Sequence, residues 1–198
     1  MNTEEKNNVV ASIDEVIALF RESPNVFLTE DDLRFHLCCR LLRYFGSAED
    51  TQDGDRSISL HSEVRWYGGG NLKMRSDIVL IDVSNLAVLR HARLPSKGFG
   101  FNIPKAIIEL KLRRPNGESQ ANFMSHIHAD IRKLSVLKRI FHNAQGQDQT
   151  AYWMIILDKK TEVREPITAP EGITIHYEYK RASRKSYVGL RIWIADVG

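Results

Sequence analysis

Three short apolar runs, each rich in β-branched residues, constrain the fold of this chain most strongly. They cover residues 74–83, 105–112 and 150–158, and each has the length of a buried β-strand. Between the second and third runs, residues 118–143 repeat apolar side chains at helical spacing. Strands interrupted by a long helix are typical of an α/β architecture. We therefore predict a mixed central sheet flanked by helices.

The remaining segments supply further helices, strands and loops. Thr29 is followed by Asp32 at the spacing of a helix capping box, and a stripe of leucines continues from there towards Gly46. Residues 9–22 also repeat apolar side chains at helical spacing. The other expected elements are strands over 58–66, 173–179 and 187–195, a glycine turn at 68–70, and loops over 47–57 and 84–104.

Composition narrows the class of protein. The 198 residues suit a single domain, 1–198, and the 42% of apolar residues excludes wholesale disorder. No apolar run approaches the ~20 residues of a membrane span, and the polar N-terminus is unlike a secretory signal. The adjacent Cys38 and Cys39 favour neither a disulfide nor a zinc site, so we expect a cytoplasmic protein. A net charge of +3 permits a nucleic-acid partner without requiring one.

Three of the charged residues in the predicted apolar strands stand out, because a charge inside such a strand is costly unless it has a partner. They are Asp77, Glu109 and Lys111. Because side chains alternate along a strand, Glu109 and Lys111 share one face. Two carboxylates on neighbouring strands can reach one hard cation such as Mg²⁺. The plainer interpretation is a Glu–Lys pair on the sheet surface, with Asp77 at a strand end.

The sequence around these charges resembles a known nuclease signature. The segments RSDIVL (75–80) and IELK (108–111) are similar to the motif of the PD-(D/E)xK superfamily, which includes restriction endonucleases and Holliday junction resolvases. With the order of elements, the resemblance covers about residues 29–158 and implies a restriction-endonuclease-like fold. Ser76 stands where the family motif has its proline, and residues 84–104 become an insertion between the two motif strands.

The resemblance also implies an activity and a site. It implies a nuclease, with an endonuclease favoured, that hydrolyses DNA phosphodiester bonds with Mg²⁺, for which Mn²⁺ is the expected substitute. Asp77, Glu109 and the Leu110 carbonyl are then expected to hold the metal ion, and Lys111 to position the attacking water. DNA becomes the expected partner, and a homodimer is expected because a duplex has two strands to cut.

Four further charged residues are candidates for auxiliary roles. Glu30 falls in the middle of the leucine stripe of its helix, so it can point to the sheet as a further acid of the metal site, although acids also favour the first helical turn. Glu63 either neighbours Asp77 or lies on a polar outer face. Asp130 and Lys133 either form a simple i,i+3 ion pair or, as the resemblance suggests, face the site or the DNA.

Basic residues near the motif are candidates for contact with nucleic acid. We expect Arg75, Arg113 and Arg114 to bind the phosphate backbone, although charge runs are often solvated loops. Phosphate-binding loops of the GxxxxGK[ST] and GxGxxG types are absent from the sequence. The alternatives to a deoxyribonuclease are a nuclease of RNA, and a catalytically degenerate module of the same fold that binds nucleic acid or a protein partner.

Overall fold

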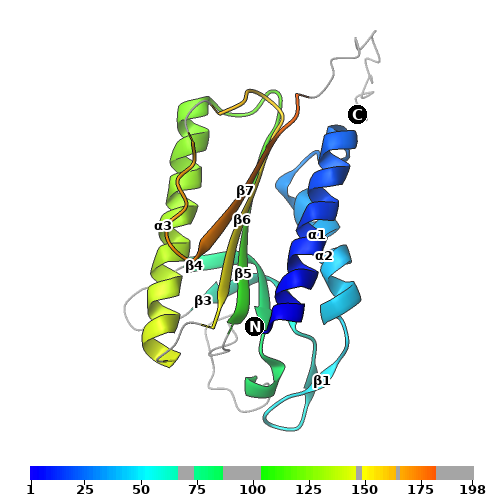
Figure 1. Cartoon of the computed structure of the whole chain (residues 1–198). Helices are drawn as coiled ribbons and strands as arrows, with labels where there is room; N and C mark the ends of the chain where they lie inside the picture. The colour runs from blue at the N-terminus through cyan, green and yellow to red at the C-terminus, as the bar shows by residue number, and fades with distance from the viewer. Residues whose placement is uncertain (67–73, 87–103, 146–148, 164–165, 182–198) are drawn as a thin grey trace, which may run out of the picture.

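The computed structural model describes residues 1–66, 74–86, 104–145, 149–163 and 166–181. Within this part of the chain, helices lie on both faces of a central sheet (Figure 1). The elements are α1 (Thr3–Glu22), η1 (Pro24–Val26), α2 (Glu30–Phe45), β1 (Glu49–Asp50), β2 (Arg56–Ser57), β3 (Leu60–Trp66), β4 (Met74–Ile81), η2 (Val83–Asn85), β5 (Pro104–Arg113), α3 (Gln120–Gln145), β6 (Ala151–Asp158) and β7 (Ile173–Tyr179).

The central sheet has five strands in the order β3-β4-β5-β6-β7. The first three strands pair antiparallel, whereas β5, β6 and β7 run parallel to one another. A parallel pair needs a crossover, and α3 supplies it between β5 and β6. The predicted α/β class with a mixed sheet is therefore confirmed.

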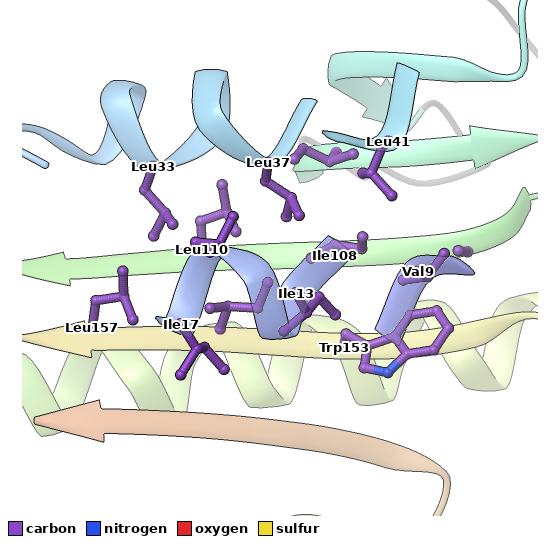
Figure 2. Close-up of a cluster of buried hydrophobic side chains, with 14 of the residues drawn as sticks. Val9, Ile13, Ile17, Leu33, Leu37, Leu41, Ile108, Leu110, Trp153 and Leu157 are labelled. Carbon is purple, nitrogen blue, oxygen red and sulfur yellow. The ribbon is translucent and has the colours of Figure 1, made fainter. Parts of the chain in front are cut away.

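Each face of the sheet buries its own apolar cluster against helices. Alternate residues of β5 separate the two clusters: Ile108 and Leu110 pack with α1 and α2, whereas Ile107 packs with α3. Figure 2 shows the first cluster, in which side chains of α1 and α2 such as Ile13 and Leu37 lie over β5 and β6. This alternation points the next odd-numbered residues of β5 towards α3.

The sequence predicted the start of α2 correctly and that of α1 too late. Asp32 accepts hydrogen bonds from the Thr29 backbone, and the Thr29 hydroxyl accepts one from the Asp32 N–H at 3.1 Å, which completes the predicted capping box. Helix α1 begins at Thr3 instead of residue 9 because Asn2 and Glu5 form a second capping box. The first turns of α1 are polar, so they left no apolar signal to follow.

Most other predicted elements are present near their expected bounds. The expected strand over 173–179 is β7, and the expected loop over 47–57 contains the short hairpin of β1 and β2. The predicted strand over 187–195, the glycine turn at 68–70 and residues 87–103 of the expected long loop lie outside the described residues. None of the helices in the described ranges is long and apolar enough to cross a membrane.

Candidate active site

The candidate site lies where strands β4 and β5 cease to pair. Their paired residues run from Ile81 and Pro104 to Ile78 and Ile108, whereas β4 stays paired with β3 up to Met74. Asp77 is the first β4 residue beyond the last pair, and the register sets it opposite Glu109. We call this point, between Asp77 and Glu109, the strand fork.

Carboxylates cap the backbone of β5 beyond the strand fork. The Leu110 N–H donates to Oδ2 of Asp77 at 2.8 Å, and the Leu112 N–H donates to Oε2 of Glu30 at 3.3 Å. These donors would pair with β4 if the ladder continued. Asp77 from β4 and Glu30 from α2 are therefore drawn to the same edge of β5, on which the Leu110 carbonyl also lies by strand geometry.

Glu109 is almost completely buried, with 1% of its side chain exposed. Its Oε2 accepts a hydrogen bond from Lys133 Nζ of α3 at 2.6 Å. Its Oε1 has no hydrogen-bond partner among the described residues. Burial raises the pKa of Glu109 to about 8; Lys133 opposes this rise, and the nearby Asp77 carboxylate adds to it.

Lys111 lies between acids from both helical layers. Its Nζ is 3.0 Å from Oδ2 of Asp130 on α3 and 3.7 Å from Oε2 of Glu30 on α2. Burial lowers the pKa of Lys111, but the two acids outweigh that effect, so the pKa is raised and the ammonium stays charged. Burial raises the pKa of Glu30, although the positive charge of Lys111 opposes the rise. Lys111 and Glu30 thus both lie beside the strand fork, and of the two alternatives for Glu30 the structure has the one that faces the sheet.

Asp130 and Lys133 are also part of the site. They form the i,i+3 ion pair at 3.2 Å that the plainer interpretation predicts, and each also reaches a residue of β5. Lys133 also donates to the Arg75 carbonyl of β4 at 2.9 Å. Helix α3 therefore contributes one acidic side chain, Asp130, and one positively charged side chain, Lys133, to the strand fork.

Glu63 joins the site through Arg34, a residue that the sequence analysis missed. Arg34 Nη2 on α2 lies 2.7 Å from Oε1 of Glu63 and donates to Oδ1 of Asp77 at 3.0 Å. Glu63 lies opposite Asp77 in the β3–β4 register and has a φ of 57°, which non-glycine residues rarely adopt. Arg34 follows Glu30 by one helical turn, and that spacing is the signal that could have found it.

The three arginines expected to contact nucleic acid divide into two groups. Arg75 and Arg114 are exposed, and Arg75 also lies 2.5 Å from Glu63 Oε2. The Arg113 side chain is 1% exposed and forms an ion pair with the fully buried Asp158. The assignment of Arg113 to DNA contact is therefore wrong: its guanidinium binds within the protein and faces no solvent.

The oxygen groups at the strand fork fit a hard divalent cation. Asp77 and Glu109 supply carboxylates, the Leu110 carbonyl lies on the same edge, and Mg²⁺ prefers such oxygen ligands together with water. The buried Oε1 of Glu109 has no partner in the part of the chain that the structure describes, so it has a lone pair for a cation to satisfy. No group of three or more acids, histidines or cysteines in the described ranges is arranged to hold a metal ion. The fit thus rests on two carboxylates and a carbonyl.

Comparison of this chain with protein-family models, with curated proteins and with solved structures finds no match. The residues at the strand fork, and the motif that they form in the sequence, are therefore the features of this chain that indicate a function.

Proposed function

We propose that this chain is a divalent-metal-dependent nuclease of the PD-(D/E)xK type, with a restriction-endonuclease-like fold, that hydrolyses DNA phosphodiester bonds. One observation carries the proposal: Asp77 of β4 contacts the peptide N–H between Glu109 and Lys111 of β5, although the motif halves are 32 residues apart in sequence. Charged side chains cost free energy when they are buried. A group of them that is dispersed in sequence but gathered at one point of a sheet is therefore typical of a functional site.

Each residue has a role in this proposal. Asp77, Glu109 and the Leu110 carbonyl would hold Mg²⁺ or Mn²⁺. The bound ion would supply Lewis-acid polarisation of the phosphate and a water of lowered pKa. Lys111 orients the attacking water and stabilises the negative charge that develops on the phosphate oxygens. Asp130 and Glu30 hold the Lys111 ammonium in place, since both lie within 4 Å of its Nζ.

DNA is the proposed substrate, with a homodimer as the proposed assembly. Arg75 is exposed beside the strand fork, where it can reach a phosphate of a bound strand. Arg114 is exposed just beyond the end of β5. Phosphate contacts of this kind position a nucleic acid without reading its sequence. A second copy of the chain would supply a second site for the opposite strand.

Cleavage assays with a matched pair of variants test the proposal. Supercoiled plasmid, branched DNA and single-stranded RNA are incubated with the full chain in Mg²⁺, in Mn²⁺ and in a chelator. The proposal predicts DNA products only with metal, and an Asp77→Asn rate at least ~100-fold below wild type. Asp77→Asn keeps an acceptor for the Leu110 N–H, so the strand fork should persist. Asp14→Asn, an exposed position on α1, serves as the control and should cleave normally.

A module without catalytic activity is the second candidate, and one observation favours it. Both proposed metal carboxylates already have cationic partners inside the protein, Arg34 for Asp77 and Lys133 for Glu109. Retained DNA binding with no metal-dependent product would support that module and contradict the nuclease. Cleavage of RNA but not of DNA would support the proposed active site and would show that the substrate is RNA.

A further inference from the structure

Lys133 occupies an unusual position for a helix lysine. Its ammonium group lies within hydrogen-bond distance of three oxygens from three elements: Glu109 Oε2 at 2.6 Å, the Arg75 carbonyl at 2.9 Å and Asp130 Oδ1 at 3.2 Å. Two of the three donors of this ammonium form hydrogen bonds, to Glu109 and to the Arg75 carbonyl, and Asp130 adds an ion pair. The Lys133 side chain is 20% exposed, whereas the Glu109 side chain is almost fully buried. The positively charged ammonium of Lys133 thus contacts Glu109, the most buried acid of the site.

We propose that Lys133 is a built-in competitor for the divalent cation at Glu109, and that it thereby sets the metal affinity of the site. The inference rests on the proposed function, because it takes Glu109 to be a metal ligand. Among the described residues, Oε1 of Glu109 is buried without a partner, whereas Oε2 accepts the hydrogen bond of Lys133. Full ligation by Glu109 therefore requires the ammonium to withdraw, and a cation bound beside it is repelled by its charge.

Lys133 can withdraw without losing all its partners. Its flexible four-carbon stem carries a compact charge, and Asp130 lies one turn away on the same helix. Arg34, the partner of Asp77, is less free to move than Lys133. Its planar guanidinium forms ion pairs with Asp31, Glu63 and Asp77 together. Of the two internal cations, Lys133 is thus the one that can exchange with a metal ion. Arg34 is expected to stay and hold Asp77 in position.

The test measures Mn²⁺ affinity directly, without an activity assay. Mn²⁺ binding to the full wild-type chain and to its variants is followed by electron paramagnetic resonance and by titration calorimetry. Lys133→Met removes the competing charge and should bind Mn²⁺ at least roughly 10-fold more tightly than wild type. Lys133→Arg keeps the charge and should bind more weakly than Lys133→Met. Lys138→Met, also on α3 but bonded to the Glu171 carbonyl, is the matched control and should resemble wild type.

Folding of the variants is checked by circular dichroism and thermal melting in chelator. If Lys133→Met does not fold, Lys133→Gln replaces it, because glutamine retains polar donors without the charge. Equal or weaker Mn²⁺ affinity in the folded neutral variant, with measurable binding by wild type, would overturn the competitor role and leave the nuclease proposal standing. Absence of Mn²⁺ binding in every protein, the neutral variant included, would overturn both proposals.

Discussion

Replacing Arg113 with methionine should strongly destabilise the fold. The Arg113 guanidinium lies at the end of β5, where its Nε donates to Asp158 Oδ1 at 2.9 Å and its Nη2 contacts both Asp158 Oδ2 and the Thr161 carbonyl. The Arg113 Cζ atom also lies 4.5 Å from the centroid of the Phe123 ring. The arginine thus joins β5 to the end of β6 and to α3, entirely inside the protein.

The expected loss follows from what the substitution leaves behind. In Arg113→Met, the buried Asp158 carboxylate keeps two partners among the described residues, the Lys160 N–H at 2.9 Å and the Tyr177 hydroxyl at 3.2 Å. Breaking one side of a buried ion pair typically costs 3–5 kcal/mol, because the remaining charge stays buried without its counter-ion. We therefore expect the free energy of unfolding to fall by about 4 kcal/mol. That is a large share of the ~5–15 kcal/mol that stabilises an ordinary domain.

Urea unfolding followed by circular dichroism measures this loss. Arg114→Met is the matched control, since Arg114 is the exposed neighbour of Arg113 and should change the free energy of unfolding by less than ~0.5 kcal/mol. An Arg113→Met protein as stable as Arg114→Met would refute the structural role. If it were also selectively weakened in DNA binding, the original assignment of Arg113 to DNA contact would be restored.

Three further predictions concern the site and helix α2. Lys111→Ala should lower the cleavage rate by ~100-fold or more while Mn²⁺ affinity, measured by calorimetry, changes little; a wild-type rate would remove Lys111 from the mechanism. Because folding raises the pKa of Glu109 from 4.5 to about 8, the stability that its protonated form contributes at low pH is lost progressively between those two pH values. Between pH 5 and 8 in chelator, wild type should therefore lose roughly 3 kcal/mol more than Glu109→Gln in urea unfolding, and parallel pH curves would contradict the buried acid. Thr29→Ala should cost about 1 kcal/mol in the same assay, and no loss would mean that the capping box contributes little.

The parts of the site that sequence predicted correctly depend on local periodicity. Strand alternation indicated that Glu109 and Lys111 share a face, and in the structure both contact α3. Helical periodicity left two positions open for Glu30, and the structure has the one that faces the sheet, where Glu30 accepts from the Leu112 N–H of β5. Such predictions can be made from one helix or strand at a time, once it is known which of its faces is buried.

The parts that sequence missed depend on partners distant along the chain. Arg113 continues the alternation of Glu109 and Lys111, so in sequence it looks like another residue of the site. Its burial follows from Asp158, 45 residues later, and no local pattern links the two. Arg34 follows Glu30 by one helical turn, but its role becomes clear only when the register of β3 and β4 brings Glu63 and Asp77 to it.

A crystal structure of the chain soaked in Mn²⁺, with anomalous diffraction recorded at the manganese edge, tests the central claim most directly. We predict one anomalous peak at the strand fork, in contact with a carboxylate oxygen of Asp77 and one of Glu109. A peak elsewhere, or a manganese ion that touches neither carboxylate, would contradict the metal site and the nuclease chemistry that depends on it.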